Sequence, residues 1–249
     1  KYIAFYAYIN CCKTNSSLYG AIKSEFERGL NMNKEWSELN KTMQAQIKKK
    51  DTYKMGIDTL FNLRRQLMQT LVSFKEDLCR EDFNAIPFIN ADGYHSKTIA
   101  YSIWHIFRIE DIVAHTVITE DEQVFFTGNY QVRINSPIIT TGNELVKQQI
   151  ADFSKQLNLE ELYSYIFEVR ESTEKILERF SYDELKWKIP DERKGYLKSL
   201  NVVNCDEKAI WLIDYWCSKD IRGLIQMPFS RHWIMHTEAC LRIKNKMHS

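Results

Sequence analysis

Long stretches of this chain contain no helix-breaking residue, and this feature constrains its fold more than any other. Only four prolines and eight glycines are spread over 249 residues. Between Asp51 and Cys79, apolar side chains recur at the spacing that is typical of one face of an α-helix. They belong to Met55, Leu60, Phe61, Leu63, Leu67, Met68, Leu71, Phe74 and Leu78. The sequence therefore predicts an all-α protein with almost no strand.

Four of the predicted helices are long. We predict long helices over 51–79, 95–118, 158–180 and 227–246, and shorter accessory helices over 33–49, 141–156, 181–189 and 204–217. Capping residues at Thr141, Asn158 and Asn204 mark the starts of three of these helices. Four long helices joined by shorter segments pack most simply as a four-helix bundle.

The least helical stretch of the chain is 120–141. It contains Gly128, Pro137 and a β-branched run at 138–141, so we predict one long irregular loop with room for a short hairpin. Loops of this length are often functional or cover an active site. We therefore expect this loop to roof any binding pocket.

Residues 1–31 are expected to be an N-terminal extension outside the core fold. Met32 opens a segment that looks like an ordinary bacterial start, so we predict that 32–249 forms a single domain. The alternative is that the extension adds a helix to the fold. The apolar run at 2–9 is only about half as long as a membrane-spanning helix needs to be, and no membrane association is predicted.

Composition argues against one class of partner and indicates a compartment. The 34 Lys and Arg residues nearly balance the 33 Asp and Glu residues, and the formal net charge is +1. The basic residues are scattered, so a nucleic-acid-binding face is not expected. The six cysteines show no C-x-x-C spacing, which favours reduced, buried thiols and a cytoplasmic protein.

Three histidines carry the main functional hypothesis. His232 and His236 are four residues apart in a predicted helix, so their side chains share one face and could bind one divalent metal. His105 lies in another apolar helix among Tyr101 and Ile109, where an unpaired imidazole would be costly to bury. If the two helices pack together, three nitrogen ligands leave an open coordination position, as in catalytic metal sites. The alternative is that these histidines are only hydrogen-bonded, because such a pair also arises by chance.

Other candidates near these histidines are weaker. His115 lies about 80° around the helix from His105 and is a poorer ligand candidate. Trp233 occupies the position at which a zincin helix needs its general-base glutamate, so peptide hydrolysis by that mechanism is not supported. Cys240 follows His236 by one turn and could be a fourth ligand, a nucleophile or a small buried hydrophobe.

The polar and aromatic neighbours have alternative roles. Glu110 or Asp111, which follow Arg108 in the same predicted helix, could orient an imidazole, although ordinary surface pairing is the simpler expectation for all three. Arg231 could bind an anionic substrate group or lie on the helix surface. Trp104 and Trp233 adjoin the ligand candidates and could form a pocket wall. The sequence shows no glycine-rich phosphate loop and no Ser-His-Asp arrangement.

These segments resemble a known superfamily. The stretches 102–111 and 227–236, together with the loop that ends at Glu144, look like those of the DinB/YfiT-like metalloenzymes. Members of that superfamily are four-helix bundles with one metal-binding histidine in the second long helix and an H-x-x-x-H pair in the last. The resemblance covers about residues 35–249 and gives 1–31 no counterpart.

The resemblance implies a metal site. By analogy, His105, His232 and His236 would hold Ni²⁺ or Zn²⁺, with water in the remaining positions. Known relatives include S-transferases that use the low-molecular-weight thiols glutathione, mycothiol or bacillithiol, and a maleylpyruvate isomerase. Family resemblance supports such a site more firmly than it supports any one substrate.

Three functional hypotheses follow. The first is a metal-dependent enzyme, such as a thiol S-transferase or a hydrolase, that acts on a small electrophilic molecule and could be a homodimer. In this case no catalytic acid, base or organic-cofactor site can be assigned. The second is a non-enzymatic, metal-stabilised helical bundle with a stress-related binding or dimerisation role. The third has no metal, and hydrogen bonds satisfy the histidines.

Overall fold

The computed structural model describes residues 33–248, and the predicted extension over 1–31 lies outside the described residues. The chain divides into two compact units, Lys1–Glu38 and Leu39–Ser249. In the first unit the described residues, 33–38, are helical. The second unit contains α3 and all later helices. Within the described part of the chain, no helix combines the length and the apolar character needed to cross a membrane.

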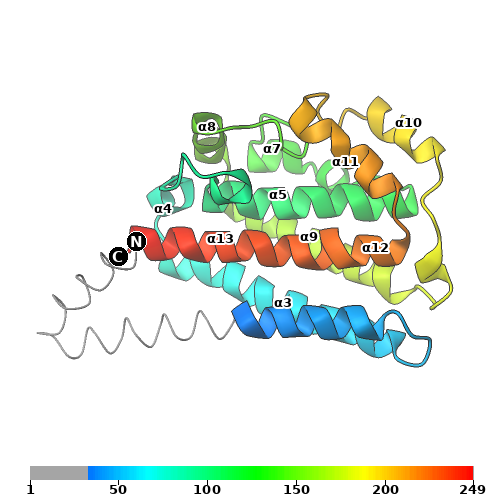
Figure 1. Ribbon diagram of the computed structural model, residues 1–249. Coiled ribbons are helices and arrows are strands. Elements are labelled where there is room, and N and C mark those ends of the chain that lie inside the picture. The colour runs from blue at the N-terminus through cyan, green and yellow to red at the C-terminus, as the bar shows by residue number, and fades with distance from the viewer. Residues whose placement is uncertain (1–32, 249) are drawn as a thin grey trace, which may run out of the picture. The chain divides into compact units, whose positions relative to one another are not determined.

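Four long helices pack together in the second unit. α5 packs against α9 and α13, and α3 packs against the same two helices (Figure 1). Two of the long helices are joined directly to π-helical segments, η2 after α5 and η4 before α13, and α12 precedes η4. The bounds are α3 Tyr53–Asp77, α5 Ile99–Asp111, η2 Ile112–Thr119, α9 Leu159–Glu178, α12 Ile221–Gln226, η4 Met227–Arg231 and α13 His232–Met247. The four long helices predicted from sequence are thus present.

Shorter helices connect and cover the long ones. They are α4 Arg80–Asn84, η1 Gly93–His95, α6 Val124–Thr127, α7 Tyr130–Ile134, α8 Gln148–Gln156, η3 Glu184–Lys186, α10 Glu192–Ser199 and α11 Glu207–Cys217. Across residues 33–248 there is no strand, and extended pairing is limited to an isolated bridge between Lys188 and Asp220. The all-α prediction is therefore confirmed for this part of the chain.

The prediction of one long irregular loop over 120–141 is wrong in part. This segment contains α6 and α7 and no hairpin. α6 begins where the buried carboxylate of Asp111 accepts hydrogen bonds from the backbone N–H groups of Val124 and Phe125, both at 2.9 Å. A helix start is normally satisfied by a neighbouring side chain. Here the acceptor comes from a distant helix, so no local signal in the sequence marks it.

The helix predicted over 141–156 begins later than expected. α8 starts at Gln148, and Gly142 has a φ of +75°, which turns the chain out of a right-handed helix. The side chain of Thr140, rather than Thr141, donates a hydrogen bond to Glu144. The capping box expected at Thr141 is therefore absent, and the segment before α8 is a loop.

The other two predicted caps differ in outcome. Asn158 caps α9 as predicted, because its side-chain oxygen accepts from the backbone N–H of Glu161 at 3.3 Å. The prediction for Asn204 is wrong by two positions. Asp206 caps α11 and accepts from the backbone N–H of Lys208 at 2.8 Å.

α5 is the central helix, and all 13 of its residues are buried. A helix that is enclosed on every side must find partners for its polar groups. Arg108 donates to the backbone oxygen of Ile139 at 3.0 and 2.7 Å, and Asp111 also accepts from the Tyr165 hydroxyl at 2.9 Å. The expectation of ordinary surface pairing for these residues is wrong. They hold the surrounding segments against the helix that carries His105.

Candidate metal centre

Three buried histidines meet where α5 crosses α13. His105 comes from the middle of α5, and His232 and His236 come from the first two turns of α13. The ring centroids of His105 lie 5.0 Å from His232 and 4.8 Å from His236, and the last two rings are 4.6 Å apart. The predicted convergence of the three rings is therefore observed, although His105 precedes His232 by 127 positions in the sequence. Packing of α5 on α13 brings them together.

The three rings lie close enough to bind one metal ion. One nitrogen from each ring can be chosen so that all three lie within 4.8 Å of one another. Two nitrogens on one tetrahedral Zn²⁺ ion, each at about 2.1 Å, lie about 3.4 Å apart. Side-chain rotations that shorten the longest nitrogen–nitrogen separation by about 1.4 Å would therefore bring all three nitrogens into bonding range.

A hydrogen bond fixes the orientation of His105. Its Nδ1–H donates to the backbone carbonyl of Thr141, with 2.7 Å between the two atoms. This bond defines the tautomer and leaves the lone pair on Nε2. Metal-binding histidines usually donate their second ring N–H to a carbonyl or carboxylate in this way. The backbone of the loop before α8 thus orients the imidazole.

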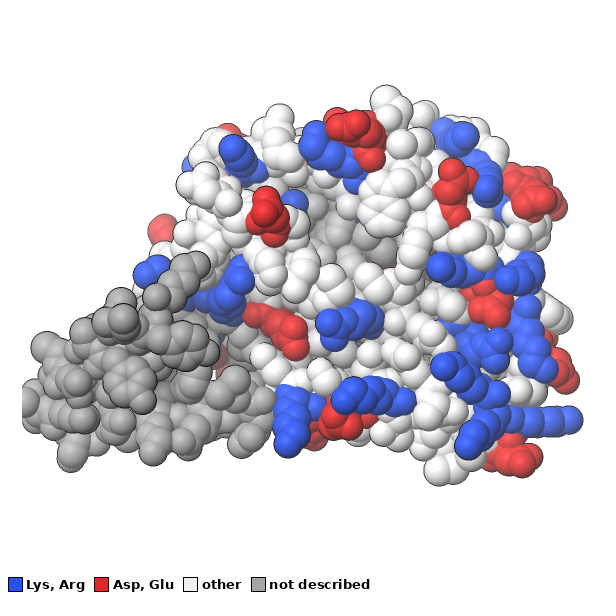
Figure 2. All heavy atoms as spheres, in the orientation of Figure 1, with Lys and Arg blue, Asp and Glu red and all other residues white. Residues whose placement is uncertain are grey.

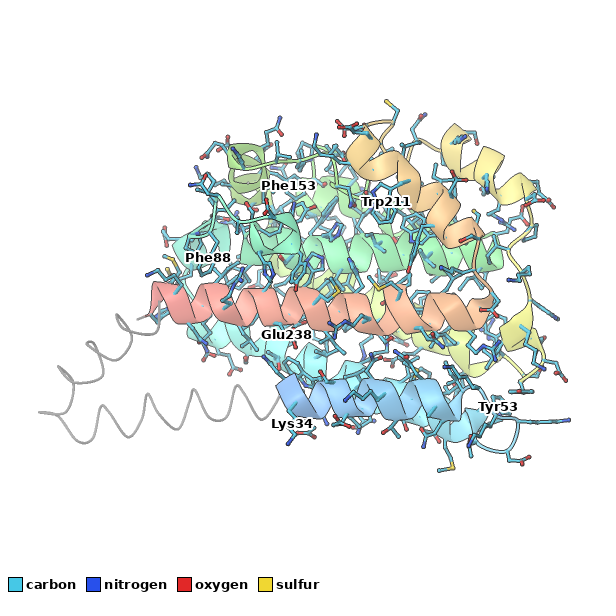
Figure 3. The ribbon with its side chains drawn as sticks, in the orientation of Figure 1. Lys34, Tyr53, Phe88, Phe153, Trp211 and Glu238 are labelled. Carbon is cyan, nitrogen blue, oxygen red and sulfur yellow. The ribbon has the colours of Figure 1, made fainter. Side chains whose placement is uncertain are left out.

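The same loop is tied to α5 by Tyr101. The Tyr101 ring is stacked on His105, with centroids 5.2 Å apart and an interplanar angle of 13°. Its hydroxyl donates to the backbone carbonyl of Gly142 at 2.9 Å. Phe153 of α8, labelled in Figure 3, packs against the same group: its ring centroid lies 6.1 Å from that of Tyr101 and 4.8 Å from that of Trp104. The position of His105 is therefore determined by aromatic packing as well as by its hydrogen bond.

All three imidazoles are held in the neutral form. Burial lowers the pKa of His232 to about 4. Burial also lowers the pKa of His105 well below its ordinary value. A charge on His232 or Lys97 acts in the same direction, whereas the hydrogen bond to Thr141 opposes the shift. Burial is again the largest cause for His236, whose pKa is also well below its ordinary value. Neutral imidazole is the form that binds a metal.

Unpartnered ring nitrogens are a second feature of the three histidines that fits a metal site. The Nδ1 atoms of His232 and His236 are buried and have no hydrogen-bond partner among the described residues. An unsatisfied buried polar atom typically costs about 1–3 kcal/mol. A bound cation would give one ring nitrogen of each of these histidines a partner. The third hypothesis, in which hydrogen bonds satisfy all the histidines, fits His105 but not the other two.

A cavity of about 510 Å³ lies beside the three histidines. His105 and His236 form part of its wall, and most of the remainder comes from two segments, 89–97 and 143–147. In Figure 2 the surface is hollowed between α11 and α13. The prediction that 120–141 would roof the pocket is wrong, because α6 and α7 pack against α9 instead.

The structure places the other ligand candidates away from the centre. His115 is bonded through Nδ1 to Asp121 at 2.7 Å and through Nε2 to Ser172 at 3.0 Å. Cys240 is buried, and burial raises the pKa of its thiol to about 12. Without a metal the thiol is therefore not an activated nucleophile near neutral pH. Among the described residues Cys240 is also not one of the side chains that lie close enough together to share an ion, in line with the small-hydrophobe alternative.

The polar and aromatic neighbours also have other partners. Glu110 accepts from Trp233 Nε1 at 2.7 Å and does not orient an imidazole. Asp111 is likewise engaged elsewhere, with the backbone of α6 and with Tyr165. The Thr141 carbonyl, rather than either carboxylate, orients the imidazole of His105. Trp104 and Trp233 do not line the cavity, and neither does the exposed Arg231.

Sequence reasoning missed a Ser-His-Asp hydrogen-bonded chain. Asp121, His115 and Ser172 are joined in that order, beside a second cavity of about 340 Å³. Ser172 lies within α9, where helical hydrogen bonds occupy the backbone N–H groups. Triad hydrolases need free donors to stabilise an oxyanion. We therefore assign these three hydrogen-bonded side chains a structural role, which is to join α9 to η2.

Sequence reasoning also missed most of the wall of the 510 Å³ cavity. Tyr101 precedes His105 by one turn, so helical spacing could have identified it. Lys97 and the loop residues 143–147 follow no periodic pattern. Their positions depend on contacts with distant helices, and no sequence signal marks them.

Gly142→Ala is expected to reduce the free energy of unfolding by about 1–3 kcal/mol. Gly142 has a φ of +75°, and an added Cβ would lie 2.8 Å from the Trp104 ring and 3.1 Å from the Tyr101 ring. The substitution should displace the loop that supports His105. Chemical denaturation measures the effect. Gly195→Ala is the control, because a Cβ there meets no atom within 4 Å. Equal stability of the Gly142 variant and the unsubstituted protein would contradict the strain argument.

No protein-family model matches this sequence, and no curated protein matches it either.

Proposed function

We propose that this protein is a metal-dependent enzyme with a DinB/YfiT-like four-helix bundle fold. In this proposal His105, His232 and His236 bind one Ni²⁺ or Zn²⁺ ion. The observation that carries the proposal is the meeting of three neutral, buried imidazoles, two of which, those of His105 and His236, form part of the wall of a cavity. A three-histidine donor set leaves coordination positions for a substrate or a nucleophile.

The arrangement of the long helices supports the proposed fold. α3, α5, α13 and α9 form a closed series of packed pairs, as the helices of a four-helix bundle do. His105 lies in the second of these helices along the chain, and the H-x-x-x-H pair lies in the last. This is the layout that the resemblance to the superfamily implies.

The chemistry of the cavity favours an external nucleophile. A divalent metal held by three imidazoles lowers the pKa of a bound thiol or water, which supplies a nucleophile near neutral pH. No cysteine lines the cavity, and the Ser96 hydroxyl is engaged with the backbone oxygen of Ile89 at 3.0 Å. The proposed reaction is transfer of a low-molecular-weight thiol to a small electrophile, or hydrolysis of that electrophile.

The chain's own residues have positioning roles in this proposal. In thiol transfer, a bond forms between sulfur and the electrophilic carbon, the leaving group departs with its electron pair, and the thiol proton passes to water. Thr141 and Tyr101 hold His105, and the segments 89–97 and 143–147 enclose the reacting molecules. Tyr101 is not a proton donor here, because burial raises its pKa and its hydroxyl is bonded to Gly142.

A second candidate function is a metal-stabilised bundle without catalysis. The observation in its favour is that the cluster joins α5 to α13 and that all three histidines are buried. In that case the metal would stabilise the fold in a protein with a stress-related binding or dimerising role. The cavity at His105 and His236 favours the enzyme.

Metal analysis tests the ligand assignment. After equilibration with equimolar Zn²⁺ or Ni²⁺ and desalting, the protein should retain about one ion per chain by plasma mass spectrometry. His105→Gln, His232→Gln and His236→Gln should each lose most of this metal, because each removes one of three ligands. His115→Gln is the matched control, since it replaces a buried histidine outside the cluster. Unchanged metal content in all three ligand variants, with helix content preserved by circular dichroism, would rule out the site.

A turnover assay separates the two candidate functions. The metal-loaded protein is incubated with low-molecular-weight thiols and an epoxide or activated aryl halide, and thiol consumption is followed. Turnover that is lost on chelation and in His105→Gln supports the enzyme. A metal-dependent rise in melting temperature without turnover of any thiol–electrophile pair supports the structural alternative.

A further inference from the structure

The cavity beside the histidines is lined by more positive than negative side chains. Its charged lining residues are Lys97, Lys147, Lys208 and Asp92. The chain as a whole has a formal net charge of only +1. The positive excess is therefore a local property of the cavity.

Lys97 is the most informative of these residues. It is half-buried, yet among the described residues no carboxylate lies within ion-pair distance of its ammonium group. The buried arginines, in contrast, each lie near a carboxylate, in the pairs Arg64–Glu110, Arg108–Asp111 and Arg193–Glu120. A partly desolvated cation without an anion is energetically costly. Burial accordingly lowers the pKa of Lys97 to about 8.

Lys97 lies one aromatic ring away from the metal centre. Its Nζ is 4.9 Å from the centroid of the Tyr101 ring, and that ring is stacked on His105. The next residue, Thr98, caps α5 by accepting from the backbone N–H of Tyr101 at 3.0 Å. The ammonium group is therefore attached to the rigid start of the helix that carries His105, a suitable place for a binding group.

Lys147 shows a second unusual feature. Its backbone has a φ of +48°, although it is not a glycine, and it directly precedes α8. Such a backbone conformation is strained for a residue other than glycine and often marks a functional position. Lys147 is exposed and lines the same cavity as Lys97. Lys208, at the cavity edge, is paired with Asp206 at 3.6 Å.

We propose that this cavity binds an anionic small molecule and that Lys97 pairs with its carboxylate or phosphate group, with Lys147 assisting at the entrance. This inference rests on the proposed function, because it names the class of substrate that the metal centre would act on. Pairing with Lys97 places the anionic group beside Tyr101 and leaves the rest of the molecule next to His105 and His236. A volume of about 510 Å³ suits a small molecule.

The chemistry of the lining indicates how selective the site is. A lysine is a point charge without the planar fork with which arginine recognises carboxylate or phosphate in a bidentate manner. No arginine lines the cavity. The site therefore selects for negative charge, and both carboxylate and phosphate satisfy it.

Calorimetry on the metal-free protein, residues 1–249, tests the proposal. The probes are succinate, inorganic phosphate and succinamide, the last being a neutral molecule of the same shape as succinate. Lys97→Met should weaken succinate and phosphate binding at least about tenfold, whereas Lys97→Arg should retain it within about threefold. Lys147→Met should cause a smaller loss of about two- to threefold. Lys54→Met, an exposed lysine outside the cavity, is the control.

Each outcome decides the proposal. Binding of succinate in preference to succinamide, lost in Lys97→Met and kept in Lys97→Arg, supports it. If phosphate binds and succinate does not, the anionic group is a phosphate. Equal binding by Lys97→Met and the unsubstituted protein, or no binding of succinate or phosphate by the metal-free protein, would overturn it. Lys97→Gln replaces the methionine variant if circular dichroism shows that the latter is unfolded.

The metal content of Lys97→Met distinguishes this inference from the proposed function. A normal metal content with lost anion binding shows that the lysine acts independently of the metal centre. If the histidine variants keep their metal while Lys97 still binds anions, the proposed function fails and the anion site remains. If the metal site is verified and the Lys97 variants bind anions normally, only the anion site is refuted.

Discussion

Replacing Arg64 with methionine is expected to lower the free energy of unfolding by about 3–5 kcal/mol. The Arg64 guanidinium forms two hydrogen bonds with the Glu110 carboxylate, at 2.7 and 2.9 Å, and both side chains are fully buried. It also donates to the backbone oxygen of Phe229 at 3.2 Å. Without the arginine, Glu110 would carry an uncompensated charge in the centre of the protein. Urea denaturation monitored by circular dichroism measures the loss.

A double variant distinguishes the loss of the Arg64–Glu110 ion pair from the cost of leaving the Glu110 charge buried without a partner. Arg64→Met with Glu110→Gln removes both charges, so it should be more stable than Arg64→Met alone. The control is Lys75→Met, which breaks the exposed pair between Lys75 and Glu160. Exposed pairs contribute little, so this variant should differ from the unsubstituted protein by less than about 1 kcal/mol. A loss below about 1 kcal/mol for Arg64→Met would show that Glu110 finds another partner or takes up a proton.

The sequence predicted those parts of the fold that follow a repeating pattern. α3 and α9 have apolar residues on one face and polar residues on the other, so their periodicity identifies them. The helical spacing of His232 and His236 likewise predicted two rings on one face. Packing of α5 on α13 adds His105 to this pair. The sequence indicated His105 as a candidate because an unpaired imidazole on an apolar helix is costly to bury.

The sequence was less informative where tertiary contacts determine local structure. The irregular loop predicted over 120–141 contains α6 because the distant Asp111 satisfies the start of that helix. The loop before α8 holds its shape through hydrogen bonds from Tyr101 and His105 to its backbone carbonyls. Neither feature is encoded by neighbouring residues. The cavity wall, which these loops form in part, could not be predicted for the same reason.

Buried charges are the other limit of the sequence prediction. Arg108, Glu110 and Asp111 follow one another at the end of α5 and have the composition of a solvated helix face. They are buried because other helices surround α5 on all sides. The periodicity of apolar residues in one helix does not show how many other helices pack around it. The charges that stabilise the centre of the protein were therefore assigned to its surface.

The metal-free protein is expected to lose stability as the pH falls from about 6.5 to about 4. An unfolded histidine has a pKa of about 6.5, whereas burial lowers the pKa of folded His232 to about 4. Between these values the unfolded state binds a proton that the folded state excludes, so acidification favours unfolding. Each such histidine contributes a slope of about 1.4 kcal/mol per pH unit, and His232 alone accounts for roughly 3 kcal/mol in total. His105 and His236 add losses of the same sign, because their pKa values are also depressed.

Urea denaturation of chelator-treated protein at several pH values measures this slope. His232→Gln removes one of the three titrating groups, so its slope should be smaller by about 1.4 kcal/mol per pH unit between pH 6 and pH 5. Carboxylates titrate in both proteins alike and cancel in the comparison. Stoichiometric Zn²⁺ should raise the stability near neutral pH and make the decline steeper, since protons then compete with the metal for the same nitrogens. Identical slopes for the two metal-free proteins would mean that His232 is accessible to protons in the folded state. Such a histidine would already be solvated, and the cost of its burial could no longer be invoked as a reason for it to bind a metal.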